Sequence, residues 1–456
     1  AQAFFGGVHP HDMKAATNEK AIEQLAPPAV VVIPMSMHFG APCTPLVKAG
    51  DHVKVGQKIG EFHGLGAPIH ASVSGTVKAV EPRPYSMGGN ITSVVIENDM
   101  QDEVSEEVQA PADPNALSVE EMVEIVKNAG IVGMGGATFP THVKITSGIG
   151  KVNTVIINGA ECEPYITGDH RTMLERPEEI IGGAKFLAKM FGVDKVVIGV
   201  EDNKRNGIDA MNKVIAEQKA PVVVEPLRCR YPQGGEKQLC QAITGRQVPP
   251  GGLPADIGCA VFNINTTCAI YRALTTGMPV VRKIVTVSGS GVVEPKNLEC
   301  PIGTPVSNLL DACGGLKDGT YKLIAGGPMM GMAQYTADIS VAKGTGAILA
   351  FCENEEKTVE NPQCIRCGKC VSVCPMHLEP LFMYQYASKG MVEELNDAHI
   401  MDCMECGACS YICPARMHLT HMFKTGKQLV KDKAAADRAA AEAKKKAEEA
   451  KEAAAK

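Results

Sequence analysis

The pattern of hydrophobic and polar positions changes several times along the chain, and each change predicts a separate domain. From residue 29 to residue 97, short apolar or alternating runs lie between glycine and proline residues, starting with Val30–Ile33 and ending with Ile91–Ile96. Such runs are typical of short β-strands joined by tight turns. The weakly patterned residues 1–28 are interpreted as a leader, and the acidic, proline-containing residues 98–117 as a linker.

Helical and extended patterns alternate between residues 118 and 280. Ser118 precedes an amphipathic stretch that carries Glu121 at the third helical position, which predicts a capped helix. Further strands are predicted at 153–157, 195–200 and 222–225, and further helices at 177–191 and 205–218. This alternation predicts a parallel or mixed sheet covered by helices.

The last part of the chain divides into three segments. Residues 281–352 contain two predicted strands and one helix, which favour a small α+β domain. Residues 353–426 are rich in cysteine and form a separate predicted domain. Residues 427–456 consist almost entirely of lysine, alanine and glutamate, which predicts a solvated helical tail because no apolar stripe is present beyond alanine.

Composition narrows the class of protein. The chain has 456 residues and a formal net charge of −6, which argues against a nucleic-acid-binding surface. No apolar run approaches the ~18 residues of a membrane span, and we expect neither such a span nor a secretory signal. Seventeen cysteines fit a reducing compartment. The sequence therefore predicts an intracellular protein of three or four domains.

Eight of the seventeen cysteines occur in two copies of the spacing C-x2-C-x2-C-x3-C-P. In this bacterial ferredoxin spacing, three thiolates bind one [4Fe-4S] cluster and the fourth binds the other. The alternative is a pair of structural zinc sites, which would need no third C-x2-C step. The spacing predicts two clusters with exchanged ligands, Cys364, Cys367, Cys370 and Cys413 for the first and Cys403, Cys406, Cys409 and Cys374 for the second.

A glycine-rich stretch from Gly130 to Lys144 is the second candidate site. Glycines let backbone amides approach a phosphate, although such a stretch can also be an ordinary turn. The strand predicted at 153–157 then runs into Asn158 and the acidic residues Glu161 and Glu163. Polar residues at the carboxyl end of a parallel strand lie where open α/β sheets bind ligands. The alternative for the two glutamates is a solvated strand end.

These two segments, Gly-x-Gly-Gly-Ala-x-Phe-Pro-Thr and Asn-x-x-Glu-x-Glu-Pro, resemble the NADH-binding flavoprotein subunit of respiratory complex I. The sequence as a whole more closely resembles the RnfC family, the C subunits of Rnf ion-translocating electron-transport complexes. The resemblance implies a multidomain α/β and α+β fold: a barrel-sandwich hybrid at 29–97, a complex-I-flavoprotein-like α/β FMN domain at 118–280, a β-grasp domain at 281–352 and a ferredoxin-like α-helical domain with two [4Fe-4S] clusters at 353–426. It further implies non-covalent FMN, with NAD(H) as substrate.

The resemblance also assigns site residues by their position in the family's motifs. It places Gly133, Gly135, Gly136 and Lys144 around the FMN phosphate and the nicotinamide side, Asn158, Glu161 and Cys162 beside the flavin, Glu163 toward the dinucleotide, Gly234 and Glu236 in a second loop, and Asn263 and Thr266 near the FMN phosphate. We expect Glu161 and Glu163 to be catalytic, and Cys162 to be either a redox-active thiol or a small packing residue. The chain departs from the complex I pattern at five positions, Met134, Thr138, His142, Ala160 and Gly235.

The expected function is hydride exchange between NAD(H) and FMN, followed by one-electron relay through the two clusters. The resemblance implies a peripheral subunit on the cytoplasmic side of the cell membrane. Its expected partners are other subunits of a membrane Rnf-type complex and, indirectly, ferredoxin. Two alternatives remain: a soluble reductase of the same build, such as a cobalamin reductase, and an electron-relay scaffold whose flavin and nucleotide pockets have degenerated.

Overall fold

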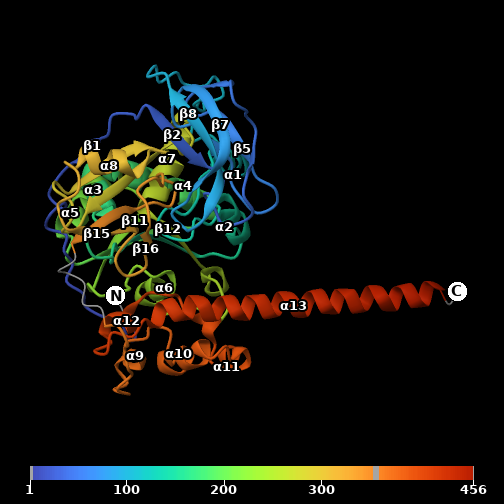
Figure 1. The fold of residues 1–456 in the computed structure, drawn as a ribbon. Helices are drawn as coiled ribbons and strands as arrows, with labels where there is room; N and C mark the ends of the chain where they lie inside the picture. Colours follow the sequence, from blue (N-terminus) through green and yellow to red (C-terminus); the bar gives the residue numbers. More distant parts are fainter. Residues whose placement is uncertain (1–3, 353–358, 455–456) are drawn as a thin grey trace. The chain divides into compact units, whose positions relative to one another are not determined.

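The computed structural model describes residues 4–352 and 359–454, with side chains described as far as residue 446. Among these residues, 10–352 form one compact unit, whereas Phe4–His9 and 359–454 form a second. Figure 1 traces both units in chain order. The first unit contains the expected strand-rich and α/β regions, and the second contains the cysteine-rich region.

Two small antiparallel sheets form the start of the first unit. One face of their strands is fully buried, as at Val31, Ile33 and Ile96, whereas Val30 and Val32 are half-buried, which explains the alternation seen in the sequence. Gly75 has a φ of +149°, and a Cβ there would lie 2.0 Å from the carbonyl oxygen of Glu97, so only glycine fits between the strands. One sheet has the order β2 (Val30–Pro34), β8 (Asn90–Asn98), β7 (Gly75–Pro84), β4 (His52–Val53), and the other the order β3 (Thr44–Pro45), β5 (Lys58–Glu61), β6 (Ile69–His70).

A four-stranded parallel sheet with helices follows, as the alternating pattern predicts. The predicted capping box is present: Ser118 Oγ accepts from the Glu121 amide at 3.2 Å, and Glu121 Oε2 accepts from the Ser118 amide at 2.7 Å. The sheet order is β11 (Val222–Leu227), β10 (Val196–Glu201), β9 (Thr154–Gly159), β12 (Cys259–Asn263). The accompanying helices are α1 (Val119–Asn128), α2 (Thr141–Gly148), α3 (Gly168–Glu175), α4 (Pro177–Phe191), α5 (Arg205–Gln218), α6 (Glu236–Thr244), the 3-10 helix η1 (Pro254–Ile257) and α7 (Ile264–Thr276).

The third region of the first unit is a six-stranded mixed sheet with its own hydrophobic core. One edge strand comes from the leader: Ile22 pairs in parallel with Asn297. The leader from Pro10 onward is therefore part of the first unit, although its sequence has little pattern. The sheet has the order β1 (Ile22–Gln24), β14 (Lys296–Pro301), β13 (Arg282–Ser288), β17 (Ala347–Cys352), β15 (Thr320–Ala325), β16 (Met332–Gln334), and α8 (Val306–Ala312) packs in its core.

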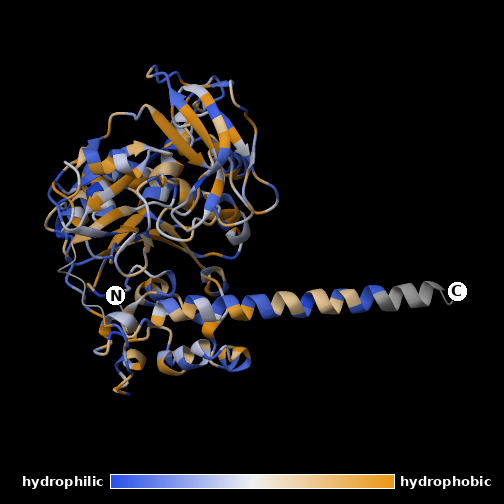
Figure 2. Cartoon of the chain, in the orientation of Figure 1, coloured by the Kyte–Doolittle hydropathy of each residue, from blue (hydrophilic) through white to orange (hydrophobic). Residues whose placement is uncertain are grey.

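The second unit is helical. Its core contains Leu419, Phe423 and Val430 from the first turns of the long helix α13 (Leu419–Ala454), whereas the side chains from Lys431 to Lys446 are exposed. In Figure 2 this second half of α13 alternates hydrophilic with moderately hydrophobic residues, consistent with the predicted solvated tail. The helix begins before the predicted tail boundary because these apolar residues anchor it. The other helices are α9 (Lys369–Ser372), α10 (Pro380–Ser388), α11 (Val392–Asp397), the 3-10 helix η3 (Ile400–Asp402) and α12 (Ala408–Ile412).

None of the helices in the described part of the chain combines the length and the apolar content that a membrane crossing requires.

Candidate functional site

The glycine-rich loop is fixed against the N-terminus of α7. Thr266 Oγ1 accepts from the Met134 amide at 2.9 Å and donates to the Val132 carbonyl at 3.2 Å. Asn263 caps the helix by accepting from the amides of residues 265 and 266. Gly135 lies so close that a Cβ would be 2.9 Å from Asn263 Nδ2, whereas a Cβ on Gly136 would meet nothing within 4 Å. The loop therefore has a closely packed side and an open side at Gly136, and the open side leaves room for a bound group.

A buried polar network that the sequence pattern gave no sign of lies next to this loop. Asp169, near the start of α3, accepts hydrogen bonds from Asn263 Nδ2 at 2.8 Å and Asn265 Nδ2 at 2.5 Å. Burial raises the pKa of Asp169, and the neighbouring Glu161 carboxylate raises it further, while Lys283 opposes both effects. Lys283 is itself buried, which lowers its pKa to about 8, and it donates to the Met134 carbonyl at 3.3 Å. These buried charged groups are thus bonded to the N-terminus of α7 through Asp169 and to the glycine-rich loop through Lys283.

Lys144, in the first turn of α2, contacts both α6 and β12. Its Nζ pairs with Glu236 Oε1 at 2.7 Å and donates to the Val261 carbonyl at 3.0 Å. It also lies 5.8 Å from the ring centroid of Phe262. About a third of its side chain is exposed, at 31%. The structure therefore brings Lys144 and Glu236 together, as predicted ligands of one site would be, and leaves part of the lysine side chain exposed.

The strand end at Asn158 meets the loop that contains Gly234. Asn158 Nδ2 donates to the Gly234 carbonyl at 2.8 Å, and the Gly234 amide points to Cys162 Sγ at 3.3 Å. A Cβ on Gly234 would lie 2.3 Å from the Ala160 carbonyl oxygen. Burial raises the pKa of the Cys162 thiol, so it stays protonated at neutral pH. These contacts favour the packing interpretation of Cys162 over a reactive thiolate.

The two glutamates predicted to be catalytic face different neighbours. Both carboxylate oxygens of Glu161 accept backbone hydrogen bonds at the start of α3, from Asp169 at 2.7 Å and His170 at 3.3 Å. Glu163 instead accepts from the Met329 amide at 3.1 Å, in the loop between β15 and β16. Burial raises the pKa of Glu163 to about 7, against the stabilising backbone hydrogen bonds. Glu163 can therefore hold or release a proton near neutral pH, whereas Glu161 is engaged as a helix cap.

Lys14 is a further residue for which the sequence pattern gave no sign of a role. It is 5% exposed, and its Nζ donates to the carbonyls of Glu161 and Glu163, both at 2.9 Å, and of Ile166. Three donors thus meet three acceptors, which satisfies an ammonium group completely. A weakly patterned leader gives no sequence signal for such a contact. Lys14 fixes the backbone of the segment that carries both predicted catalytic glutamates.

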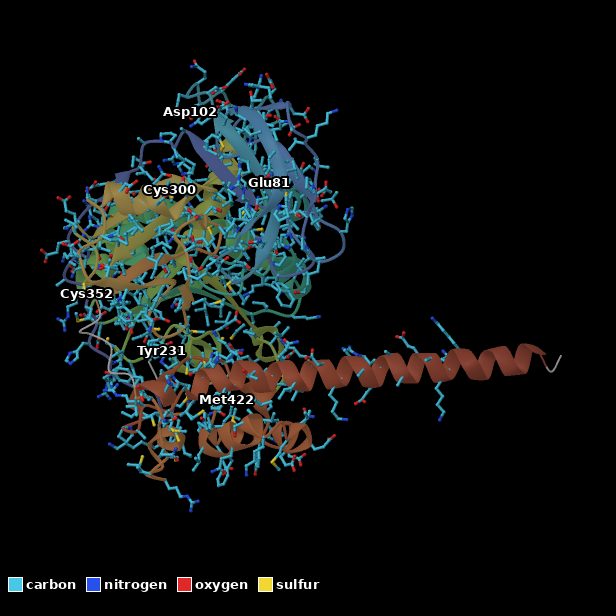
Figure 3. All side chains as sticks on the ribbon, viewed as in Figure 1. Glu81, Asp102, Tyr231, Cys300, Cys352 and Met422 are labelled. Carbon is cyan, nitrogen blue, oxygen red and sulfur yellow. The ribbon has the colours of Figure 1, made fainter. Side chains whose placement is uncertain are left out.

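Buried polar groups without protein partners test whether the site fits a cofactor. Gln233 is 3% exposed and its Nε2 has no hydrogen-bond partner within the described residues. It follows Tyr231, which is 2% exposed and is marked in Figure 3, in the loop that also contains Gly234. Unpaired buried donors are rare in folded proteins. The unpaired amide and the open side of the glycine-rich loop are both compatible with a bound flavin nucleotide.

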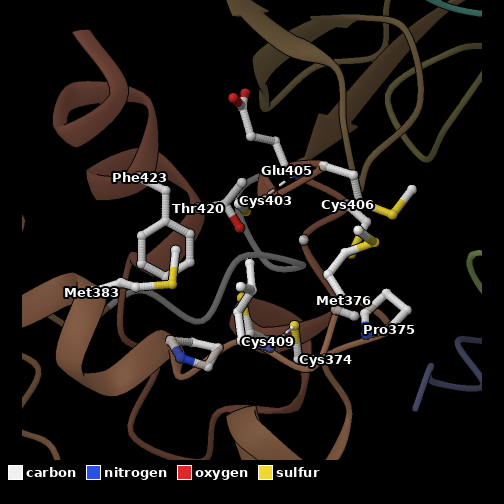
Figure 4. A pocket seen from close by; sticks show the side chains of 15 residues that line it. Cys374, Pro375, Met376, Met383, Cys403, Glu405, Cys406, Cys409, Thr420 and Phe423 are labelled. Carbon is white, nitrogen blue, oxygen red and sulfur yellow. Dashed lines mark hydrogen bonds between the residues drawn. The ribbon is translucent and has the colours of Figure 1, made fainter. Parts of the chain in front are cut away.

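In the second unit, four cysteines line one pocket, shown in Figure 4. Phe423 and Met383 form an apolar wall of this pocket. All four thiols line this one pocket, and the other three raise the pKa of the Cys409 thiol further than burial alone. The cysteines are Cys374, Cys403, Cys406 and Cys409.

This set is the one predicted from the spacing for the second cluster, including the fourth ligand from the other motif. The first predicted set behaves similarly, because Cys413 and Cys364 both raise the pKa of Cys370, after burial. Backbone amides also point at sulfur, such as Arg366 N to Cys364 Sγ at 3.4 Å. Hydrogen bonds to sulfur are a feature of iron–sulfur sites.

Within the described residues, no three His, Cys, Asp or Glu side chains are arranged to hold a single metal ion. The thiol-lined pocket fits a cluster, whose ligands each bind a different iron.

Comparison with known protein families assigns all four regions. Residues 2–101 match the RnfC barrel sandwich hybrid domain, 126–272 the Nuo51 FMN-binding domain, 284–333 the SLBB domain and 356–414 the 4Fe-4S dicluster domain. The predicted fold class, a barrel-sandwich hybrid followed by an FMN-binding α/β domain, a β-grasp domain and a dicluster domain, is confirmed.

Individual relatives point to the same family. The chain is 45% identical over 401 residues to the C subunit of the Na(+)-translocating ferredoxin:NAD(+) oxidoreductase complex of Acetobacterium woodii, covering 88% of this chain and 90% of the relative. It is 43% identical over 400 residues to the proton-translocating counterpart of Clostridium ljungdahlii, covering 87% of each. Among solved structures, an air-oxidised NAD+-reducing [NiFe]-hydrogenase has a TM-score of 0.49 at 17% identity, covering 64% of this chain and 60% of that one. By its identity and coverage, the chain belongs to the RnfC family, the C subunits of Rnf-type ion-translocating ferredoxin:NAD+ oxidoreductase complexes.

Proposed function

We propose that this chain exchanges hydride between NAD(H) and FMN, and relays the electrons singly through two [4Fe-4S] clusters to or from partner subunits. When bound, FMN supplies the change from two-electron to one-electron chemistry, and the clusters supply the one-electron relay. Ion translocation belongs to the partner subunits of the membrane complex, to whose cytoplasmic face this chain binds peripherally. Ferredoxin is the indirect partner.

The observation that carries this proposal is the meeting of three predicted segments at the carboxyl end of one parallel sheet. The glycine-rich loop rests on the N-terminus of α7, which begins at Ile264. The end of β9 at Gly159 continues into the segment with Glu161 and Glu163, beside the loop that contains Gly234. Ligands of open α/β sheets bind at this position.

Within this site we assign roles to the chain's own residues. The amides of Gly133, Gly135 and Gly136, together with Asn263 and Thr266, hold the flavin phosphate end, where a helix N-terminus favours an anion. Asn158, Glu161, Cys162 and Gly234 border the flavin. Lys144, Glu236 and Glu163 form the side that receives NAD(H), with Glu163 able to hold a proton because its pKa is raised to about 7.

For the clusters we assign the exchanged ligand sets. Cys364, Cys367, Cys370 and Cys413 hold one, and Cys403, Cys406, Cys409 and Cys374 hold the other. The second set is supported by the four-thiol pocket. The first is supported by Cys413 and Cys364, which both raise the pKa of Cys370.

The test uses the full chain, reconstituted anaerobically with iron, sulfide and FMN. We expect about one FMN and about eight irons per chain, because two [4Fe-4S] clusters contain that number. NADH should bleach the flavin absorbance, and an artificial one-electron acceptor should restore it. A chain that binds iron but neither retains FMN nor responds to NADH would be an electron-relay scaffold. A chain that reduces a corrin directly, without membrane subunits, would be a soluble reductase.

A further inference from the structure

The two predicted cluster sites differ in exposure although their sequences are duplicated. Cys364 and Cys367, in the first loop, are exposed. At the equivalent positions of the second loop, Cys403 is half-buried and Cys406 is buried. Because electron transfer slows steeply with distance, the first site offers the shorter path to a group outside this unit. The thiols of the second site instead line the pocket described above.

The charge of the two loops also differs position by position. Arg366 occupies the place that Glu405 has in the second loop, and Lys369 the place of the fully buried Ala408. Glu405 is neutralised by Lys427 at 2.7 Å. Both cations of the first loop are exposed. The first site is therefore basic at its surface, while the second is neutral.

A third cation adds to the first site. Arg416 is exposed, and its amide donates to the carbonyl of Cys413, a predicted ligand of the first cluster, at 3.1 Å. No acidic residue occurs in the described stretches 361–378 and 406–418 that surround this site. Glu360 is the nearest carboxylate that precedes Cys364 in the described sequence. The next residue after the first stretch, Glu379, is exposed, so the basic character belongs to the segments that carry the cysteine motifs.

The same two segments also carry exposed apolar side chains. Ile365 is 65% exposed, Tyr411 42% and Val371 40%. Exposed apolar groups with a charged rim are typical of protein interfaces, and small electron-transfer interfaces depend on charge for orientation. We name the set Arg366, Lys369 and Arg416 with Ile365, Val371 and Tyr411 the basic cluster face.

We propose that the basic cluster face is the docking surface for an acidic one-electron carrier protein. One electron passes between the carrier and the site of Cys364, Cys367, Cys370 and Cys413, so that one partner is oxidised by one electron as the other is reduced. No bond forms or breaks and no proton moves. This inference rests on the ligand sets of the proposed function, and it adds which of the two sites faces the partner and what charge the partner carries.

The test uses a dithionite-reduced acidic bacterial 2[4Fe-4S] ferredoxin as a probe of the basic cluster face, in place of the native carrier. Electron transfer from this probe to the reconstituted full chain is measured by stopped-flow absorbance. The variant Arg366→Gln/Lys369→Gln/Arg416→Gln removes the three cations without touching a ligand. The control Lys424→Gln/Lys431→Gln/Arg438→Gln removes three exposed cations from α13. Iron content and NADH bleaching of the flavin are measured for each protein.

At low ionic strength we expect the rate constant to fall about ten-fold for the basic-face variant and by less than about two-fold for the control, because steering by complementary charge accelerates association by about 10–10³-fold. The salt dependence of the rate should flatten in the basic-face variant alone. Equal rates for the two variants, at full iron content, would overturn the proposal. Absence of NADH bleaching in the unmodified chain would instead refute the flavin function, because the ferredoxin reaction does not require it.

Discussion

Replacement of Lys14 by methionine tests whether the leader fixes the segment with the predicted catalytic glutamates. Methionine keeps most of the apolar stem but removes the three bonds to the carbonyls of Glu161, Glu163 and Ile166. Each buried carbonyl left without a donor costs about 1–3 kcal/mol. Part of this cost is offset because the buried ammonium no longer has to be desolvated, a cost that is visible in its lowered pKa. We expect a net loss of about 3 kcal/mol in the free energy of unfolding.

The matched control is Lys20→Met. Lys20 also comes from the leader and also donates to a carbonyl, that of Pro295 at 2.8 Å, but it is exposed and makes this single bond. Surface bonds of this kind contribute little, so a change within about 0.5 kcal/mol is expected. Lys14→Arg should recover only part of the loss, because a planar guanidinium cannot point three donors at carbonyls placed around an ammonium.

Chemical denaturation of the apo-protein measures the change in the free energy of unfolding, and FMN titration measures the change in the FMN Kd. We expect the FMN Kd to rise about ten-fold in Lys14→Met, which corresponds to about 1.4 kcal/mol lost at the site itself. Amide hydrogen exchange should accelerate in residues 161–167 before it does elsewhere. If Lys14→Met and Lys20→Met were equal in both stability and FMN affinity, the three hydrogen bonds of Lys14 would have no role in forming the site.

Three further predictions concern the cofactor sites. The pKa of Glu163 is raised from 4.5 to about 7 in the folded chain, so the folded chain binds more protons and loses stability as the pH rises between these values. Relative to Glu163→Gln, the free energy of unfolding should fall by about 3 kcal/mol across this range, and a difference that does not change with pH would contradict the prediction. Gly136→Ala should lower FMN occupancy without changing the Tm of the apo-protein, because the added Cβ meets no protein atom within 4 Å. Gly346→Ala, where a Cβ is equally free of contacts, is the control, and unchanged FMN binding in Gly136→Ala would show that Gly136 is not part of the site. Cys374→Ser should lose about four irons per chain, together with the spectroscopic signal of the cluster bound by the second motif, while Cys352→Ser, the control, should lose neither. Loss of the cluster bound by the first motif instead would refute the exchange of ligands between the two motifs.

The parts of the site that the sequence predicted are those where neighbours in space are neighbours in sequence. The capping box at Ser118 and each C-x2-C-x2-C triplet depend on contacts within a few residues. Cys374 lines the pocket of the second triplet although it belongs to the first motif, and the repeated ferredoxin spacing predicted this exchange. The strands of the first unit were predictable because burial on one or both faces leaves a periodic apolar pattern. Features that depend on spacing or periodicity along the chain can therefore be predicted from the sequence.

Lys14 and Asp169 could not be predicted in the same way. Lys14 meets carbonyls that lie 147 to 152 residues away, and a lone lysine in a weakly patterned segment is normally solvated. Asp169 reaches side chains 94 and 96 residues away, at the N-terminus of α7. Neither partner set forms a spacing motif, because carbonyls occur at every residue and asparagine is common in turns. Only the tertiary fold shows which of many possible partners is used.

The position of Asp169 bears on one of the departures from the complex I pattern. Ala160 replaces the usual aspartate there, which on sequence alone weakens the case for a working flavin site. In the fold, Asp169 supplies a carboxylate that binds the amides of Asn263 and Asn265 at the same helix N-terminus. A buried carboxylate is therefore present beside the glycine-rich loop although Ala160 carries none. This favours a working pocket over the degenerate-scaffold alternative, because a buried acid is costly unless it is paired, and Asp169 is both hydrogen-bonded and opposed by the buried Lys283.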